Sequence, residues 1–402
     1  MGKISFKSNG KIDIHVLIDI SAFLFILGLF VFENATYSTI FDIIQNLFIG
    51  IMFLYALKRR KIPVSYIYMW MGIFVITSFL ITLLNINTGE NSAVAIIIKN
   101  IVRGICLAIY ITANDNYIKI VKFIAASGLI CSVFIFTEFV SMGMNYSDVR
   151  YASFDRVGAS IAGGNVNIVA LNMSFAFTAW FFLLIKSDKR KNKLLCLACM
   201  IIITGMSLLT GTRKLLLFYA VVYFIYMFFY GSKKIRKIGM TFLVIIVCYY
   251  CILNIEPLYY LIGHKVDFFS DSNTVNLYEA SDRIRENLLI GGINLFKENP
   301  IFGIGFGNTT QVIGNYAHNN FVELLASGGI VGFVAYYSGY IYIVLKSIHY
   351  RKSDKFALYI FASIMGLLVL EYFQVTYLYG MPWVLLVISM TYCDTMICNK
   401  DK

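Results

Sequence analysis

The sequence predicts an all-α polytopic membrane protein with about twelve transmembrane helices. The chain has 402 residues, of which 59% are hydrophobic and only 14% are charged, whereas an ordinary soluble protein has about a quarter of its residues charged. The charges lie in clusters between apolar runs of roughly twenty residues, and a helix of that length crosses about 30 Å of hydrocarbon. These runs are continuous rather than alternating, which excludes a β-barrel.

Twelve apolar segments are predicted to cross the membrane, and residues 1–402 are expected to form a single integral membrane domain. The first segment follows Lys3, Lys7 and Lys11, and no small-residue cleavage site comes after it. We therefore expect an uncleaved signal anchor. The predicted spans are 14–32, 37–57, 64–84, 93–111, 118–141, 159–185, 194–210, 212–230, 238–256, 319–345, 356–377 and 380–398.

The distribution of basic residues predicts the orientation in the membrane. The net charge is +12, and when loops are assigned alternately with the N-terminus inside, 24 of the 34 Lys and Arg fall inside and 8 fall outside. This positive-inside bias predicts cytoplasmic N- and C-termini and one large extracytoplasmic loop at residues 257–317. Topology thus explains the basic charge, and no nucleic-acid partner is expected.

The loop at 257–317 is predicted to contain an amphipathic helix. Ser281 or Asp282 provides a cap, and apolar residues then recur at helical spacing as far as Phe296. Asn299-Pro300 ends the pattern. We expect this helix to lie at the outer membrane surface.

His318 is the first candidate for chemistry, because the loop ends at Ala317-His318-Asn319-Asn320, directly before an apolar span. The chain has only four histidines. An imidazole titrates near pH 6.5, so His318 could accept a proton at neutral pH. The alternative is a polar residue at a helix end that is hydrogen-bonded to the backbone.

Four of the arginines predicted in outer segments are candidates for substrate binding. Arg213 follows Thr210-Gly211-Thr212 in a short turn, Arg283 and Arg285 open the loop helix, and Arg156 precedes Gly158. Guanidinium groups bind phosphate oxygens bidentately, and each charge-assisted bond contributes about 1.5–3 kcal/mol. Two or three of them together would hold a lipid diphosphate, whereas the alternative for each is a snorkelling interfacial cation.

Lys99 and Arg103 lie four residues apart, hence on one face of the fourth span. A cation at mid-bilayer costs about 2.5–3.5 kcal/mol, so both must face protein, water or an anion. One interpretation is structural pairing with Glu138, Glu323 or Glu371. The other is a role in the path of a lipid phosphate.

Asn165 and Asn167 follow the small residues Ala162-Gly163-Gly164 at the start of the sixth span. They could donate to sugar or phosphate, or they could bond between helices. The eight cysteines lie in or beside apolar segments, which favours helix packing over redox or metal chemistry. No Asp-x-Asp motif occurs, and no metal or other cofactor is predicted.

These residues, in this order, resemble the O-antigen ligase and Wzy-type polysaccharide polymerase superfamily of bacterial envelopes. Residues 281–345 resemble its signature loop-helix segment, through Asn299-Pro300-Ile301-Phe302-Gly303-Ile304-Gly305 and His318-Asn319-x-x-Val322-x-x-Leu325-x-x-x-Gly329-x-x-Gly332. Arg285, eleven residues before Phe296, has the spacing of the family's loop arginine.

Three further features are similar to the family, and two depart from it. Thr210-Gly211-Thr212-Arg213 matches its short-turn arginine, and Arg156-x-Gly158 with Gly164-Asn165-x-Asn167 is similar to the start of its sixth span. Ser327 stands where many members have Glu, and Leu289 stands where many have Trp.

The resemblance implies an inverting glycosyltransferase on the outer face of the bacterial cytoplasmic (inner) membrane. The donor is an oligosaccharide on undecaprenyl diphosphate, and the acceptor is another lipid-linked unit. His318 would act as the base, and Arg213 and Arg285 would bind the diphosphate without a metal. Further substrate contacts are expected from Arg156, Arg283, Asn165, Asn167, Asn319, Lys99 and Arg103.

The preferred interpretation is a polymerase of capsular or O-antigen repeat units. It implies membrane lipid, a flippase and a chain-length regulator as partners. One alternative is an O-antigen ligase that transfers glycan to lipid A core or another acceptor. An alternative of a different class is a twelve-span transporter or flippase.

Overall fold

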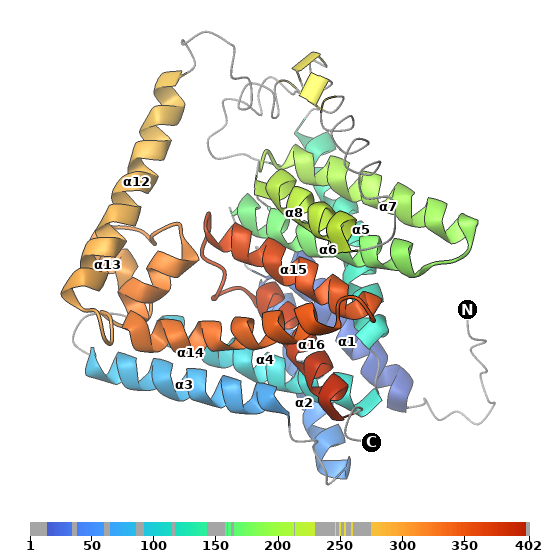
Figure 1. Cartoon of the computed structure of the whole chain (residues 1–402), viewed down its shortest axis with the longest axis horizontal. Helices are drawn as coiled ribbons and strands as arrows, with labels where there is room; N and C mark the ends of the chain where they lie inside the picture. The colour runs from blue at the N-terminus through green and yellow to red at the C-terminus, as the bar shows by residue number, and fades with distance from the viewer. Residues whose placement is uncertain are drawn as a thin grey trace.

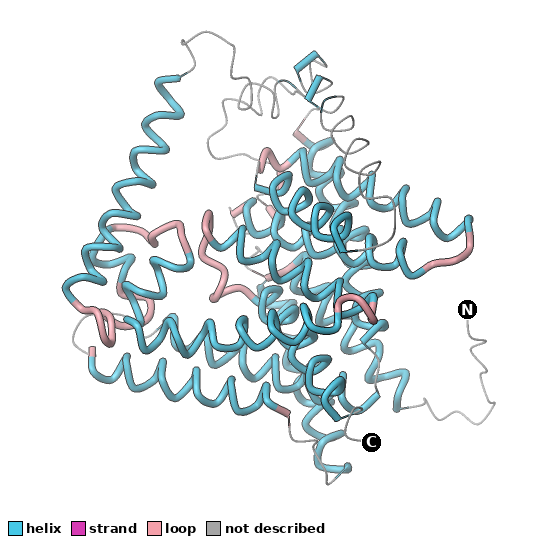
Figure 2. Tube along the Cα trace, viewed as in Figure 1, coloured by secondary structure: helices cyan, strands magenta, loops and turns pink. Residues whose placement is uncertain are grey.

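A computed structural model describes the greater part of the chain. The described residues are 14–33, 38–59, 65–85, 92–114, 117–142, 157–158, 160–161, 165–212, 214–229, 246, 249–250, 253–254, 259 and 275–398. Within them the structure is helical and contains no strand, as Figure 2 shows. The helices are α1 (Ile14–Val31), α2 (Ser38–Arg59), α3 (Tyr66–Leu84), α4 (Ser92–Asn114), α5 (Tyr117–Ser141), α6 (Val166–Lys186), α7 (Arg190–Leu209), α8 (Lys214–Phe229), α12 (Val275–Glu298), α13 (Thr309–Ile313), α14 (Asn320–Tyr350), α15 (Lys355–Glu371) and α16 (Gly380–Cys398).

Eight of the described helices are long and apolar enough to cross a membrane, namely α1 to α7 and α14. This confirms a polytopic helical membrane protein. The helices α8, α15 and α16 occupy three more of the predicted spans. The predicted span at 238–256 lies largely outside the described residues, so the number twelve and the orientation of the termini stay predictions.

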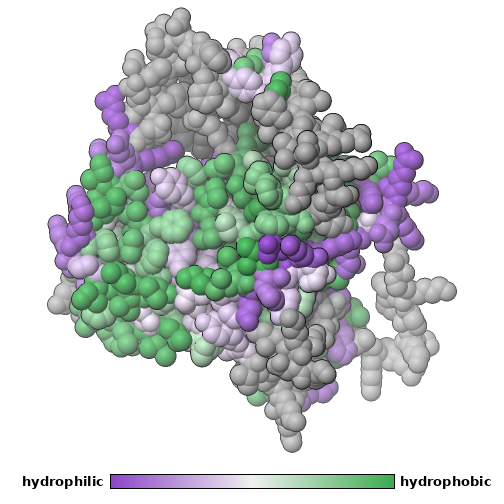
Figure 3. All heavy atoms as spheres, viewed as in Figure 1, coloured by the Kyte–Doolittle hydropathy of each residue, from purple (hydrophilic) through white to green (hydrophobic). Residues whose placement is uncertain are grey.

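Apolar side chains cover much of the outer surface of the helix bundle. Figure 3 shows a hydrophobic area over α3 and α14, which lie side by side in Figure 1. The exposed apolar side chains of these two helices include Ile76 and Phe79 of α3 and Val334 and Ile341 of α14. A continuous apolar surface of this kind is unfavourable in water and suits contact with lipid.

The core where α3, α14 and α16 meet is aromatic. The ring centroids of Trp70 and Trp383 are 5.5 Å apart, and those of Phe74 and Tyr336 are 5.3 Å apart. The indole N–H of Trp70 donates to the carbonyl oxygen of Ala335 at 3.0 Å. Aromatic pairs at these separations contribute about 0.5–1.5 kcal/mol each beyond the area they bury.

The limits of two helices differ from those of the predicted spans. The span predicted at 159–185 is α6, which starts about seven residues later because the Asn165 side chain caps it, accepting from the N–H of Asn167 at 3.2 Å. The span predicted at 356–377 is too long, since α15 ends at Glu371. Thr376 turns back to donate its hydroxyl to Glu371 at 2.6 Å.

The helix predicted in the outer loop is α12, and it begins about six residues before the predicted cap and ends, as predicted, ahead of Asn299-Pro300. Its second half packs closely on α13 and α14. A Cβ on Gly292 would lie 2.7 Å from Val322, and one on Gly291 would lie 3.1 Å from Ile313. Figure 1 shows α12 crossing the end of α14 steeply. Its location at the outer membrane surface stays a prediction.

Helix α14 is broken at Gly329, whose dihedral angles are φ 60° and ψ −165°. Residues 300–305, which we call the strap, lie against the break. Their backbone pairs with α14 on both sides of it: Ile304 N–H donates to Ala326 O at 2.9 Å, and Ile330 N–H donates to Pro300 O at 2.9 Å. The strap therefore satisfies backbone groups that the break releases, as irregular backbone inside a membrane protein requires.

Candidate active site

A small pocket surrounds His318 and is built from four separate parts of the chain. These are the start of α6, the start of α8, the segment before α14 and the loop 372–379 between α15 and α16. The lining residues are Asn165, Asn167, Ile168, Lys214, Tyr316, His318, Gln374, Val375 and Tyr379. Three residues predicted from the sequence thus come together: His318, Asn165 and Asn167.

The backbone of His318 is held in an unusual conformation. Its φ of 54° makes it the one non-glycine residue with positive φ among those the structure describes. Such conformations cost free energy and persist only where the surroundings impose them, which is frequent at functional sites.

Contacts on both sides of His318 impose this conformation. Before it, the Ala317 N–H donates to a buried Glu323 oxygen at 2.8 Å, and the hydroxyl of Thr309 donates to the other oxygen. After it, Asn319 caps α14 by accepting from the Phe321 N–H at 2.9 Å. The Asn319 amide also donates to a backbone carbonyl of the 372–379 loop. Because Asn319 is buried and engaged with backbone, we assign it no substrate contact.

The imidazole of His318 is half-buried and lies against Tyr316, with 4.2 Å between ring centroids. Burial is the largest cause, and together with the positive charges of Arg285 and Lys214 it lowers the pKa of His318 to about 4. The ring is therefore neutral at neutral pH and able to accept a proton. An anion that neutralised the two cations would raise the pKa of His318 and make the imidazole a stronger base.

The pKa of His318 leads to an expected pH profile. Among the described residues, Arg285, Lys214, Tyr316 and Tyr379 are the charged and titratable groups around the ring. Because the base must be neutral, we expect kcat/KM to stay level from about pH 7.5 to 5.5 and to fall near pH 4. Arg285→Gln is expected to move this fall to higher pH, since it removes a cation that disfavours imidazolium. A fall centred at pH 6.5 in both proteins would contradict the assignment.

The same pKa affects stability in acid. The folded-state pKa of His318 lies below the unfolded value of about 6.5. As the pH falls from about 6.5 to 4, the unfolded chain takes up this proton first, so the free energy of unfolding decreases. Above pH 6.5 both states are neutral at this residue and the contribution vanishes.

Two cations act on the pocket from different helices. Lys214 lines it directly, and its ammonium group donates to the Phe373 carbonyl at 2.7 Å. Arg285 acts on His318 from the exposed side of α12, where Arg283 is also exposed. Lys214 was not among the predicted site residues, although it directly follows Arg213 in the sequence.

Arg213 and Arg156 lie outside the described residues. The segments beside them do meet, because a Cβ on Gly158 would lie 3.6 Å from the Thr210 side chain. The Gly158 N–H donates to Glu138 at 2.8 Å, which fixes this turn against α5.

Lys99 and Arg103 form ion pairs whose partners the sequence analysis predicted wrongly. Lys99 pairs with Asp42 at 2.9 Å, and Arg103 pairs with Glu33 at 2.8 Å. Helical spacing shows which residues share a face, but it does not show which helices are neighbours.

The three predicted partners are engaged elsewhere. Glu138 binds the turn at Gly158, and Glu323 binds the N–H of Ala317. Glu371 accepts from Tyr340 at 2.6 Å. A direct substrate contact by Lys99 or Arg103 stays an untested prediction.

A comparison with known protein families finds a match, and the matched residues include part of this site. Residues 197–337 match the family described as O-Antigen ligase. That region contains Lys214, Arg285, the strap and His318 with its helix cap, whereas Asn165 and Asn167 lie before it. No curated protein matches the sequence. The match over residues 197–337 therefore supports the resemblance of this membrane protein to the O-antigen ligase and Wzy-type superfamily.

Proposed function

We propose that the protein is a metal-independent, inverting glycosyltransferase that polymerises lipid-linked repeat units of a capsular polysaccharide or O-antigen. The single observation that carries this proposal is the neutral, strained His318 in a pocket shared with Lys214 and influenced by Arg285. The reaction takes place on the outer face of the bacterial cytoplasmic membrane. The donor is a glycan on undecaprenyl diphosphate, and the acceptor is another lipid-linked unit.

His318 is the general base in this mechanism. Its imidazole takes the proton of an acceptor hydroxyl as the oxygen attacks the anomeric carbon of the donor. The bond from that carbon to the diphosphate oxygen breaks, and undecaprenyl diphosphate leaves with the bonding electrons. The imidazolium then returns its proton to water. A positioned base of this kind contributes about 10²–10⁴ in rate.

The cations bind the diphosphate and stabilise the charge that develops as it leaves. Lys214 and Arg285 take this role, together with Arg213 and with Arg156 and Arg283 at the margin. Donor binding also neutralises the two cations that lower the pKa of His318. The base thus becomes stronger only when the leaving group is in place, which suppresses wasteful reaction of the empty enzyme.

Asn165 and Asn167 line the pocket from α6, and we assign them to hydroxyl groups of the bound sugars. Membrane lipid surrounds the site, a flippase supplies lipid-linked units, and a chain-length regulator limits the product. A ligase that transfers finished glycan to lipid A core is the second candidate, because the matched family is described as O-Antigen ligase.

Supplying one substrate tests the proposal. Purified protein in lipid nanodiscs is given undecaprenyl diphosphate-linked repeat units alone. A polymerase converts them into a ladder of products and releases undecaprenyl diphosphate. The matched control is a repeat unit whose acceptor hydroxyl is replaced by hydrogen, which should give no ladder.

Two outcomes would contradict a polymerase. Transfer that begins only when lipid A core or another acceptor is added would indicate the ligase. Movement of lipid-linked units across a vesicle membrane, with no new glycosidic bond, would indicate the transporter.

A further inference from the structure

Tyr379 contributes a hydroxyl group to the His318 pocket from the end of the 372–379 loop. The hydroxyl accepts from the Asn165 amide at 3.4 Å. Burial raises the pKa of Tyr379, so the hydroxyl keeps its proton at neutral pH. A phenol that accepts one hydrogen bond retains its own proton to donate, and it faces the same pocket as the imidazole.

The backbone is held on both sides of Tyr379. On one side, the Leu378 carbonyl accepts from the Asn100 amide at 3.0 Å. On the other, the Gly380 N–H donates to a Glu33 oxygen at 3.1 Å. The approach at Gly380 is close, since a Cβ there would lie 2.5 Å from Leu29. Two residues from α4 and the end of α1 therefore determine where Tyr379 lies.

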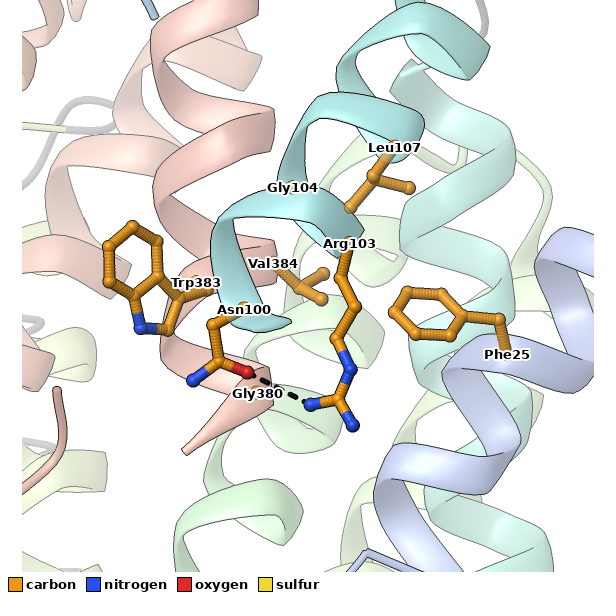
Figure 4. A pocket seen from close by; sticks show the side chains of 8 residues that line it. All are labelled: Phe25, Asn100, Arg103, Gly104, Leu107, Gly380, Trp383 and Val384. Carbon is orange, nitrogen blue, oxygen red and sulfur yellow. Dashed lines mark hydrogen bonds between the residues drawn. The ribbon is translucent and has the colours of Figure 1, made fainter. Parts of the chain in front are cut away.

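Arg103 orients both of these residues. Its guanidinium donates to the other Glu33 oxygen at 2.8 Å and to the Asn100 side-chain oxygen at 2.9 Å. It also donates to Gln45 at 2.7 Å. Figure 4 shows the side chains of Arg103 and Asn100 converging near Gly380. With its oxygen engaged by Arg103, the Asn100 amide is left to present its N–H groups to the loop.

This arrangement gives the buried ion pair a use other than stability. The side chains of Arg103 and Glu33 are 7% and 9% exposed. Buried pairs of this kind often stabilise a protein no more than well-packed apolar residues would, because both charges lose their hydration. Apolar residues could not replace the hydrogen bonds that run from Arg103 through Asn100 to Leu378 and through Glu33 to Gly380.

We infer that Tyr379 donates a hydrogen bond to a hydroxyl group of the acceptor sugar, and that Arg103, acting through Asn100 and Glu33, is a positioning residue for Tyr379. The inference rests on the proposed function. It gives the acceptor its own contact in the pocket, on the 372–379 loop, apart from the cations of α8 and α12 that bind the donor diphosphate.

Acceptor kinetics test the inference. A repeat-unit oligosaccharide without the lipid diphosphate can act only as acceptor, and it is titrated at a constant concentration of lipid-linked donor. Tyr379→Phe removes one neutral hydrogen bond, so we expect the acceptor KM to rise about 3- to 10-fold while kcat changes less than about twofold. The donor KM is expected to stay unchanged.

The positioning role has a separate readout. Arg103→Lys keeps the charge but loses the three-way set of bonds. Asn100→Ala removes the bond to Leu378 together with the bond that Asn100 accepts from Arg103. Both are expected to raise the acceptor KM as Tyr379→Phe does. Combining either with Tyr379→Phe should add little, because each removes the same contact.

Two control variants separate positioning from general damage. Lys119→Met removes another ion pair of α1, the 2.6 Å bond to Asp19, and should lower the melting temperature without changing the acceptor KM. Tyr372→Phe alters an exposed side chain in the same loop and should change neither.

The outcomes distinguish the inference from the proposed function. An unchanged acceptor KM in Tyr379→Phe, with an active wild type, overturns the acceptor contact alone. Additive defects in the combined variants overturn the positioning role of Arg103. A wild-type protein that forms no glycosidic bond with any acceptor refutes the proposed function, and the inference falls with it.

Discussion

A His318→Asn protein is expected to insert and fold normally and to lose about 10²–10⁴ of its polymerising rate. The change removes the base but keeps the backbone conformation, because Asn tolerates the left-handed conformation that His318 adopts at φ 54°. Alanine at this position would lose the base and also strain the turn, so Asn is the sharper substitution. The rate is measured from the product ladder and from released undecaprenyl diphosphate.

A rescue experiment distinguishes a base from a structural residue. His318→Gly keeps the positive φ without strain and opens space in the pocket, so added imidazole is expected to restore part of the lost rate. Near-wild-type polymer from His318→Asn would remove His318 from the mechanism. Equal melting temperatures for wild type and variant show that a loss of rate is not a loss of fold.

Gly329→Ala is expected to prevent correct folding or to lower the melting temperature severely. The dihedral angles of Gly329 fall in a region open essentially only to glycine. A Cβ there would overlap the carbonyl of Ile301 and would lie 2.6 Å from the Phe302 N–H nitrogen. Both contacts belong to strap backbone that is itself bonded to α14, so neither side can move easily. We expect a loss of stability of about 3 kcal/mol or more.

Gly314→Ala is the matched control for this prediction. Gly314 also has positive φ, at 81°, but a Cβ there would meet nothing within 4 Å. The Gly314→Ala substitution should therefore lower the free energy of unfolding only by the conformational penalty of about 1–2 kcal/mol. Detergent melting curves and gel filtration compare the two proteins. Equal behaviour would mean that the strap does not pack on the broken helix as described.

Hydrophobicity was sufficient to predict most helices, but it failed where aromatic residues lie in a loop. The described spans begin and end close to the predicted limits because long apolar runs are favourable only inside lipid or a core. Residues 372–377 of the loop between α15 and α16 were predicted as helix, since Tyr, Phe and Val dominate them. In the structure the course of this loop is determined by bonds to Glu371, which directly precedes the loop, and to Asn320 and Asn100, which are far away in the sequence.

The centre of the site was predictable, and its surroundings were not. His318 stands out because histidine is rare in the chain and because it directly precedes an apolar span. The neighbouring helices decide that Lys214 and Tyr379 line the pocket and that Arg103 pairs with Glu33. Hydropathy does not show which helices are neighbours. The strap was visible as a glycine-rich motif, but its pairing with α14 follows from a helix break that helical spacing does not reveal.

For the proposed glycosyl transfer, the break in α14 sets the level at which His318 would act. The helix has 31 residues, about 46 Å at 1.5 Å per residue, whereas the hydrocarbon layer is about 30 Å thick. The part that follows Gly329 spans about 32 Å by itself and is enough to cross it. The preceding turns and His318 would then stand among the lipid head groups, where the proposed prenyl-anchored pyrophosphate would be tethered by its own tail. Under the proposed function, each growing glycan would extend into the aqueous space while its reactive end stayed at a constant depth in the membrane.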